Sequence, residues 1–449
     1  MPDSRADALP TTLAGWLDLL EARHGAAICL GLERVARARA ALGPDPDAVI
    51  ITVGGTNGKG STCAMLEAIL RADGYRVGCY TSPHLLRYNE RVRLDGAQAD
   101  DEALVAAFAA VEAARGETPL TYFEHGTLAA WQMFRAARPD VVILEVGLGG
   151  RLDAVNVIDA DCAIISGVAL DHMAYLGDTR EAIGFEKAGI CRAGRPAICG
   201  DPRPPASLVE HAAAIGAELW VSGRDFGFSG ERLQWTYWRH EAPSAQGLPM
   251  KRAGLAYPAL RGANQLLNAA AALTALDTLR ARIPVSMQAI RQGLMQVELP
   301  GRFQVLPGQP AVVLDVAHNP QAAGVLADNL SNMGFYPDTW AVCGMLADKD
   351  VEGVAARMAA RVGRWLPCTL PGPRGLDAGT LAARLRAAGV ENGAIVDGFT
   401  SPAAAFARAR ESAAPNDRIV AFGSFLTVAG VLAAMQGRRG SMQYKEVDR

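Results

Sequence analysis

The stretch VIITVGGTNGKGSTCAMLEAILRA, residues 49–72, decides the fold of this chain of 449 residues. Its first five residues, 49–53, are all β-branched and, apart from Thr52, apolar, which predicts a buried strand. From residue 61 to residue 72 the apolar residues recur with the period of a helix, and glycines and polar residues separate the two segments. A strand that leads through a glycine-rich turn into a helix is typical of a βαβ unit, so the sequence predicts a parallel α/β sheet.

The turn GGTNGKGST, residues 54–62, predicts a phosphate site. Backbone N–H groups and the start of the following helix are directed at one point, and Lys59 adds a full positive charge. Ser61 or Thr62 can reach a magnesium ion on the nucleotide. The loop departs from the standard Walker pattern because Gly60 separates Lys59 from Ser61 and the glycine spacing is shorter. The alternative, a turn with a solvated lysine, is disfavoured by four glycines between a strand and a helix.

The alternation of strands and helices continues along the chain, with one interruption. Further strands are predicted at 76–80, 140–145 and 162–166, with helices such as 61–72 and 101–115 between them. Residues 219–260 break this rhythm and predict a small antiparallel element, which a helix over 264–282 follows. The pattern then restarts with predicted strands at 312–315, 340–343, 394–396 and 418–422. We expect an α/β protein with two domains: a phosphate-loop ATPase domain with a parallel sheet (1–297) and a smaller Rossmann-like domain (298–449).

Composition excludes several classes of protein. The 44 Lys and Arg residues against 47 Asp and Glu give a net charge of −3, which argues against a nucleic-acid binder because such proteins need a concentrated basic field. Eight cysteines without a C-x-x-C pair exclude a disulfide scaffold and the common zinc modules. The first residues show no secretory signal, and the uncharged stretch 419–436 is short for a membrane span. We expect a cytoplasmic protein with no membrane partner.

Polar residues follow several predicted strands. Glu145 ends one strand, Ser82 follows another, and Asp171 and His172 come shortly after residues 162–166. Ligands of open parallel sheets bind beyond the carboxyl ends of the strands, so Ser82, Glu145 and His172 are candidates for one magnesium site. Taken singly, each has a structural alternative, such as a solvated carboxylate or a hydrogen-bonded core histidine.

Two further groups are ambiguous from pattern alone. Lys187 lies in a predicted helix and, from spacing, reads as an exposed lysine. Asp315, His318 and Asn319 follow a strand in the predicted second domain. They either contribute to the site from that domain, or Asn319 merely caps a helix.

With these residues assembled, the chain closely resembles the folylpolyglutamate synthase/dihydrofolate synthase family, within the Mur ligase superfamily. The similarity runs through nearly the whole length. TYFE together with GGRLDA is most similar to the bacterial bifunctional enzymes. The motifs that carry the resemblance are GLERV (31–35), GTNGKGS (55–61), TSPHLLRYNERV (81–92), TYFEHGT (121–127), ILEVGLGGRLDA (143–154), ALDHMAYLG (169–177), LPGRF (299–303), DVAHNP (315–320), GMLADKD (344–350) and GSFLTVA (423–429).

The resemblance implies an ATP-dependent carboxylate–amine ligase that uses an acyl phosphate. Its substrates would be L-glutamate with 7,8-dihydropteroate, and further glutamates with reduced folates. Matched by motif, the residues that would bind ATP are Thr56, Asn57, Gly58, Lys59, Gly60, Ser61, Asn268, Arg302 and Asp315. Those that would bind the pterin are Leu30, Gly31, Thr121, Tyr122, Phe123, Leu152, Asp153 and Ala154. Cys29 stands where the family often has Asp, which leaves the pterin contact there open.

The resemblance also implies two magnesium ions. Ser82, Glu145 and His172 match the family's magnesium ligands, and Lys187 matches a lysine that family members carry carbamylated. This reverses the reading of Lys187 as an ordinary surface residue. Lys59, Lys187 and His318 are the expected catalytic residues.

Three alternatives stay open at this point. The first is a folylpolyglutamate synthase without the dihydrofolate synthase activity. The second is an amino-acid ligase acting on a UDP-sugar, although such enzymes carry an extra N-terminal domain for the UDP group. The third is a phosphate-loop switch without ligase chemistry. This alternative is disfavoured because the chain retains all four candidate residues, Ser82, Glu145, His172 and Lys187. We expect a monomer, because two joined domains supply the whole site.

Overall fold

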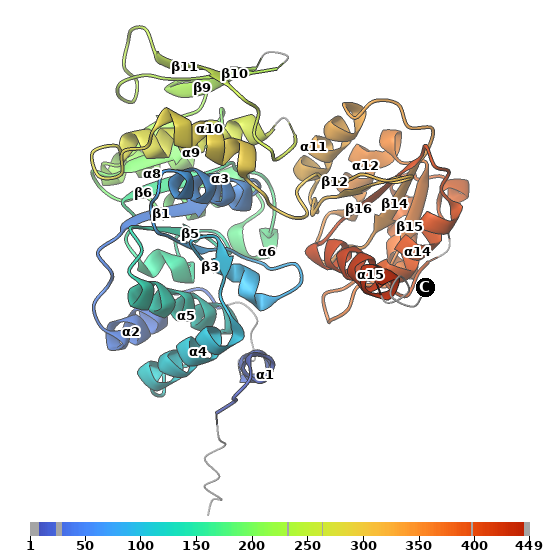
Figure 1. Ribbon diagram of the computed structural model, residues 1–449, viewed down its shortest axis with the longest axis horizontal. Coiled ribbons are helices and arrows are strands. Elements are labelled where there is room, and N and C mark those ends of the chain that lie inside the picture. Colours follow the sequence, from blue (N-terminus) through green and yellow to red (C-terminus); the bar gives the residue numbers. More distant parts are fainter. Residues whose placement is uncertain (1–8, 24–28, 231–232, 263, 397, 444–449) are drawn as a thin grey trace, which may run out of the picture. The chain divides into compact units, whose positions relative to one another are not determined.

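The strand predicted before the phosphate loop is β1 (Val49–Gly54), and it lies inside an eight-stranded sheet of the computed structural model (Figure 1). The structure describes residues 9–23, 29–230, 233–262, 264–396 and 398–443. These fall into two units. The first comprises Met1–Val168, Thr179–Tyr257 and Leu267–Val297, and the second comprises Ala169–Asp178, Pro258–Leu266 and Glu298–Arg449. Two short segments of the first 297 residues therefore belong to the second unit.

The large sheet of the first unit is mostly parallel, as predicted. Its strand order is β4-β3-β2-β5-β1-β6-β7-β8, with β1 parallel to both β5 and β6 and with β3 and β4 antiparallel at one edge. All six residues of β1 are buried, as expected for a strand covered on both faces. Besides β1, the strands are β2 (Val77–Tyr80), β3 (Val92–Leu94), β4 (Ala97–Gln98), β5 (Val141–Glu145), β6 (Cys162–Ile165), β7 (Pro196–Cys199) and β8 (Glu218–Val221).

Helices cover both faces of this sheet (Figure 1). Helix α3 packs on one face with α10 against it, where a Cβ on Gly293 would lie 2.5 Å from the Cα of Ile69. Helices α4 and α5 pack together on the other face. The helices are α1 (Leu13–Arg23), α2 (Glu33–Leu42), α3 (Lys59–Ala72), α4 (Asp101–Arg115), α5 (Tyr122–Ala137), α7 (Arg180–Ala188), α8 (Ala206–Ile215), α9 (Asn264–Thr278) and α10 (Met287–Gln296), with short 3-10 helices η1 (Tyr88–Arg91) and η2 (Ala154–Val157).

Two predictions for the segment between residues 219 and 282 have different outcomes. The antiparallel element is confirmed as a three-stranded sheet of β9 (Phe226–Gly230), β10 (Trp235–Arg239) and β11 (Met250–Leu255). Trp235 and Tyr237 are fully buried, as their alternation along the strand requires. The helix predicted over 264–282 ends earlier, at Thr278. After Thr278 the chain continues in turns, in which Arg280 N–H donates to the Asp277 carbonyl and Arg282 N–H to the Leu279 carbonyl.

The second unit contains a five-stranded sheet in the order β12-β13-β16-β14-β15, parallel except for β12 at the edge. Its core includes Val313, Trp365, Val420 and Phe422. The strands are β12 (Gln304–Leu306), β13 (Ala311–Leu314), β14 (Thr339–Cys343), β15 (Arg364–Pro367) and β16 (Arg418–Phe422). The helices are α6 (Met173–Leu176), α11 (Pro320–Ser331), α12 (Val351–Met358), α13 (Ala378–Ala387), α14 (Pro402–Ser412) and α15 (Phe425–Gln443), with 3-10 helices η3 (Ala359–Arg361) and η4 (Asn392–Ala394).

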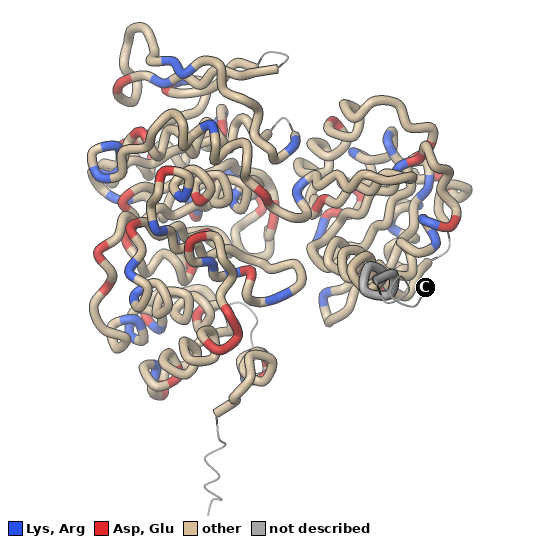
Figure 2. Tube along the Cα trace, in the orientation of Figure 1, with Lys and Arg blue, Asp and Glu red and all other residues tan. Residues whose placement is uncertain are grey.

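One strand predicted for this unit is wrong. Residues 392–394 form η4, and Ile395 makes only an isolated bridge to Trp365. The uncharged stretch 419–436 is divided between β16 and α15, as the sequence indicated, and among the described residues no helix is long and apolar enough to cross a membrane. Acidic and basic residues are interspersed along both units (Figure 2).

Candidate functional site

The phosphate loop holds its shape through two glycines and a serine. Gly55 has a φ of +137°, and a Cβ there would lie 2.0 Å from the Ser166 Oγ at the end of β6. That hydroxyl lies 3.1 Å from the carbonyl oxygen of Gly54 and 2.7 Å from that of Asn57. Gly58 has a φ of +92°, and its Cβ would lie 2.5 Å from the Asn268 Oδ1 of α9. The loop therefore lies against Asn268, one of the residues matched to ATP binding.

Lys59 opens α3 and its side chain arches back over the loop. Its Nζ donates to the carbonyl oxygens of Gly55 (3.1 Å) and Thr56 (3.3 Å). Thr62 Oγ1 donates to the Gly58 carbonyl at 3.0 Å, so Thr62 takes part in the helix start. Ser61 and Thr62 were both predicted to reach a nucleotide-bound magnesium ion. Because the Thr62 hydroxyl bonds the helix backbone, Ser61 remains the candidate. The loop presents a cation and a helix N-terminus at one point, which suits a polyphosphate.

The first unit brings together two of the predicted metal ligands. Glu145 ends β5, opposite Val53 of β1, and only 3% of its surface is exposed. Its Oε2 accepts from the Ser82 N–H at 3.1 Å. His172 lies in the Ala169–Asp178 segment of the second unit, with a φ of +52°. A site shared by all three residues stays a prediction.

Lys187 is buried, with 3% of its surface exposed, so the reading from spacing as a surface lysine is wrong. It lies near the end of α7, where a Cβ on Gly150 would come within 3.2 Å of the Lys187 Cα. The adjacent Arg151 N–H donates to the Glu186 carbonyl at 2.7 Å, and the two side chains form an ion pair. The glycine-rich segment after β5 is thus packed directly on the helix that carries Lys187.

Three of the segments matched to pterin binding meet in the first unit. Gly31 N–H donates to the Leu152 carbonyl at 3.4 Å, and a Cβ on Gly147 would lie 2.5 Å from the Phe123 ring. Asp153 is buried and accepts from the Leu148 N–H at 2.8 Å. Burial raises the pKa of its carboxyl to about 7, although the backbone N–H groups that donate to it oppose this rise.

Helix α5 delivers the aromatic residues of this region. Thr121 caps the helix, and Glu124 reaches back to the Thr121 N–H at 2.7 Å, which completes a capping box. Arg34 binds the same Glu124 at 2.7 Å and donates to the Cys29 carbonyl at 3.0 Å. Tyr122 and Phe123 begin the helix, so their positions depend on these contacts. Arg34 and Glu124 lie within recognised motifs, but sequence reasoning gave them no role.

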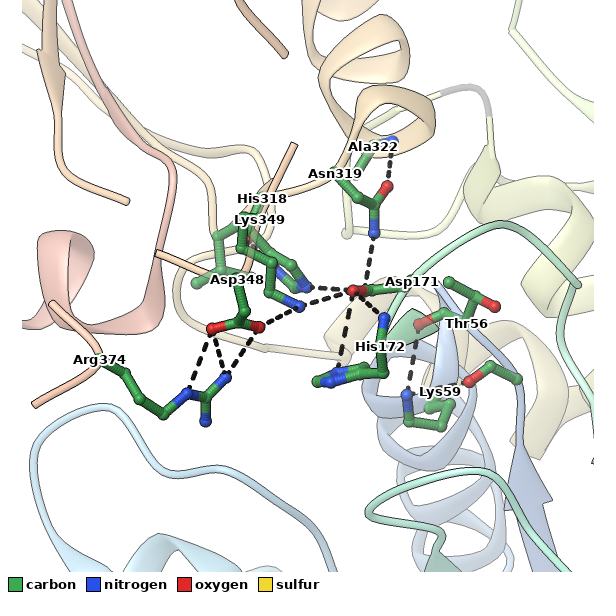
Figure 3. A network of polar contacts seen from close by, with 12 residues as sticks. Thr56, Lys59, Asp171, His172, His318, Asn319, Ala322, Asp348, Lys349 and Arg374 are labelled. Atoms are coloured by element: carbon green, nitrogen blue, oxygen red, sulfur yellow. Dashed lines mark hydrogen bonds and ion pairs between the residues drawn. The ribbon is translucent and has the colours of Figure 1, made fainter. Parts of the chain in front are cut away.

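In the second unit, Asp171 is the centre of a polar network (Figure 3). Its carboxylate binds Lys349 Nζ at 2.6 Å, His318 Nε2 at 3.3 Å and Asn319 Nδ2 at 3.2 Å. Burial alone would raise the pKa of Asp171, but the hydrogen bond from His318 and the nearby cations hold it well below its usual range. Asn319 also accepts from the Ala322 N–H, so it caps α11 and contributes to the network at once.

Lys349 is the residue of this network that sequence reasoning missed. It lies in GMLADKD, and neither the sequence pattern nor the resemblance gives this lysine a role. Asp315, by contrast, was predicted. It accepts from the Phe303 N–H at 2.9 Å and the Ala317 N–H at 2.8 Å. Burial raises the pKa of Asp315, while the charge of Arg302 opposes that rise. Among the described residues no group of three or more His, Cys, Asp and Glu side chains is arranged to hold a metal.

Residues 53–276 match the Mur ligase middle domain and residues 301–425 match the Mur ligase glutamate ligase domain. The dihydrofolate synthase/folylpolyglutamate synthase of Escherichia coli (strain K12) is 44% identical over 437 residues, which cover 97% of this chain and 98% of that protein.

Solved structures agree with this similarity. The E. coli FolC complex with DHPP and ADP has a TM-score of 0.88 at 43% identity, covering 96% of this chain and 99% of that one. A bifunctional folylpolyglutamate synthase/dihydrofolate synthase with Mn, AMPPNP and L-glutamate bound has a TM-score of 0.86 at 44% identity, covering 96% of this chain and 100% of that one.

Proposed function

Because the chain belongs to the dihydrofolate synthase/folylpolyglutamate synthase family of Mur ligases, we propose that the geometry above serves an ATP-dependent ligase acting on folates. The enzyme joins L-glutamate to 7,8-dihydropteroate and adds further glutamates to reduced folates. The observation that carries the proposal is the phosphate loop, in which Gly58, directly before Lys59 and α3, lies against Asn268. We also propose that it acts as a monomer in the cytoplasm.

The chemistry requires activation of a carboxylate, because its oxygen is a poor leaving group at neutral pH. Transfer of the γ-phosphoryl group of ATP to the acceptor carboxylate gives an acyl phosphate. The glutamate amine then attacks the carbonyl carbon, and phosphate leaves. Lys59 and the backbone N–H groups of the loop stabilise negative charge on the transferring group. Thr56, Asn57, Gly58, Gly60, Ser61, Asn268, Arg302 and Asp315 complete the proposed nucleotide site, and His318 is a proposed catalytic residue.

The enzyme binds ATP with a divalent cation, and we propose magnesium at two sites. The donors of the first unit fit this ion, because the Glu145 carboxylate and the Ser82 hydroxyl are hard oxygen ligands and the Ser82 N–H already orients Glu145. We propose His172 as a further ligand. A bound magnesium ion would offset phosphate charge. Lys187 would join the set as a carbamate, whose carboxylate oxygens replace the cationic amine that cannot bind a metal.

The acceptor site is proposed to use Leu30, Gly31, Thr121, Tyr122, Phe123, Leu152, Asp153 and Ala154. Phe123 and Tyr122 offer flat apolar surface for a pterin ring, and Asp153 offers polar atoms at its edge. A carboxyl with a pKa of about 7 exists in both protonation states near neutral pH, so it can either donate to or accept from the ring.

The test of the function is ADP release that depends on L-glutamate, measured with dihydropteroate and separately with tetrahydrofolate. Both acceptors should support turnover; release with tetrahydrofolate alone would indicate the monofunctional alternative. Lys59→Ala should lower kcat/KM by about a thousandfold or more, since it removes a charge that stabilises the transferring phosphoryl group. Lys251→Ala, which changes an exposed lysine of β11, is the matched control and should remain active. An active Lys59→Ala would remove the phosphate-loop assignment.

The carbamate has its own test. Intact-protein mass spectrometry under native, bicarbonate-containing conditions should show one added CO2 on the wild-type enzyme and none on Lys187→Ala. Small carboxylic acids should partly restore activity to Lys187→Ala, because they can occupy the space of the carbamate. Full activity of Lys187→Ala without any addition would contradict the proposal.

A further inference from the structure

A pocket lies in the second unit, at the sheet edge away from Asp315. Asp315 directly follows β13 at its carboxyl end, whereas Thr339 and Arg418 are the first residues of β14 and β16. Because β13, β14 and β16 are parallel, their first residues lie at the opposite edge from Asp315. The pocket has a volume of about 370 Å³. Its walls come from the segments 330–339 and 360–363 together with Arg418.

Arg418 is the most unusual residue of this pocket, because it is a buried arginine with an exposed fraction of 5%. Its Nε donates to Thr339 Oγ1 at 2.9 Å, its Nη1 donates to the Leu330 carbonyl at 2.5 Å, and its guanidinium lies over the Tyr336 ring at 5.0 Å. These hydrogen bonds use two of the five N–H groups of the Arg418 guanidinium. Within the described part of the chain, Arg418 forms no ion pair with a carboxylate.

The nearby carboxylates are engaged elsewhere. Asp338 accepts from the Thr339 N–H at 2.7 Å and lies 3.5 Å from Arg364 Nε. Asp417 accepts from the Asp338 N–H and from the indole of Trp340, both at 3.2 Å. Neither carboxylate is within ion-pair distance of Arg418 in the described residues.

A second arginine lines the same pocket. Arg361 ends η3 and is exposed. Burial lowers the pKa of the Arg418 guanidinium, and the positive charge of Arg361 lowers it further. Buried charges in proteins are ordinarily paired, so the buried Arg418, with the like charge of Arg361 in the same pocket, favours an anion there. A role for Arg418 in capping α11 explains the bond to Leu330, but it explains neither Arg361 nor the open volume.

We propose that this pocket binds a small organic oxyanion, a carboxylate or a phosphate, between Arg361 and Arg418. The planar guanidinium fork matches either group with two parallel hydrogen bonds. The volume is within the range of about 300–1,000 Å³ of small-molecule sites, so it has room for more than an inorganic ion. Tyr336 and the exposed Phe335 supply apolar surface for the rest of the ligand. This inference is independent of the ligase site.

Hydrogen exchange with mass spectrometry on the full chain tests the proposal, with inorganic phosphate and succinate as separate probes. Either probe at millimolar concentration should slow exchange, saturably, in peptides that contain residues 331–339 and 360–364. Phosphate alone would identify a phosphate site, and succinate alone a carboxylate site. Binding at the phosphate loop would protect residues 49–62 instead, so the two locations are distinguished.

Three variants decide the outcome. In Arg361→Ala, the probe concentration that gives half of the maximal protection should rise by about tenfold or more, because a charged hydrogen-bond partner is lost. Arg408→Ala, an exposed arginine of α14 outside the pocket, should leave it unchanged. Arg418→Lys keeps the charge but loses the fork, and should also weaken binding. No protection with either probe, or equal protection in Arg361→Ala and the wild type, would overturn the proposal.

Discussion

At the scale of single residues, the phosphate loop depends on backbone conformations that only glycine adopts at low cost. Gly58 combines a φ of +92° with close approach of Asn268, whereas Gly74 has a similar φ of +90° and open space around it. A side chain at either position meets left-handed strain of about 1–2 kcal/mol. Only at position 58 would it also displace a residue of the proposed nucleotide site.

We therefore expect backbone strain to lower the free energy of unfolding by comparable amounts in Gly58→Ala and Gly74→Ala. In Gly58→Ala the clash with Asn268 should lower it further. Glutamate-dependent ADP release should fall at least about tenfold in Gly58→Ala alone, because Asn268 must move. Denaturant unfolding and steady-state kinetics on both variants check this. Equal activity of the two variants would mean that the approach of Asn268 is unimportant.

Asp153 gives a second prediction at this scale. Its folded pKa is about 7, and its unfolded value is about 3.9. Between these values the folded chain holds the proton and the unfolded chain does not, so the contribution of Asp153 to stability decreases as pH rises from about 4 to about 7. Relative to that of Asp153→Asn, the free energy of unfolding of the wild type should fall by up to about 4 kcal/mol over this pH range. Denaturant unfolding at several pH values measures the difference; a difference that is flat, or that grows in favour of the wild type, would contradict it.

At the scale of elements, the start of α5 joins a helix cap to residues that we propose bind the pterin. Thr121 accepts from the Glu124 N–H, and Glu124 returns the bond and pairs with Arg34. Thr121→Val keeps the shape and removes the acceptor, which should lower stability by about 1 kcal/mol. Thr121 is itself a proposed pterin residue, and Tyr122 and Phe123 follow it directly, so the KM for dihydropteroate should rise severalfold.

The cap of α4 supplies the control for this prediction. Asp100 accepts from the Ala103 N–H, and none of the residues proposed to bind substrate lies on α4. Asp100→Ala should therefore lower the free energy of unfolding by a similar amount and leave the KM for dihydropteroate unchanged. An equal rise in KM in both variants would mean that general destabilisation, and not the position of α5, is responsible.

Elements were predictable where the signal was local and repeated. β1, β5, β6 and α4 follow from apolar periodicity, and α4 has the bounds that the sequence indicated. The two-residue strand β4 gives no periodic signal, and the apolar Ala394–Val396 run pairs with its neighbour at one residue only. In the site, the glycines and Lys59 were predictable from spacing, whereas the burial of Lys187 was not. The helix that carries Lys187 packs against Gly150, which lies far away in sequence.

At the scale of the whole molecule, the chain has two separate cores. Trp365 is fully packed in the core of the second unit, beside Phe422. The segment Ala169–Asp178 belongs to this unit although it precedes more than a hundred residues of the first, and Asp171 is held there by His318, Asn319 and Lys349. Removal of a core residue from one unit should therefore affect segments that are distant in sequence.

Trp365→Ala should destabilise the second unit by about 3–5 kcal/mol, because it leaves a large cavity. Hydrogen exchange should then increase in β13, β14 and β16 and also in residues 169–178, while β1 and β5 keep their protection. Trp131→Ala, at a buried position of the first unit, should produce the reverse pattern. Because two-state behaviour fails when domains unfold separately, exchange by segment is the appropriate measure. If residues 169–178 respond to Trp131→Ala and not to Trp365→Ala, then His318 and Lys349 do not anchor the segment that carries His172.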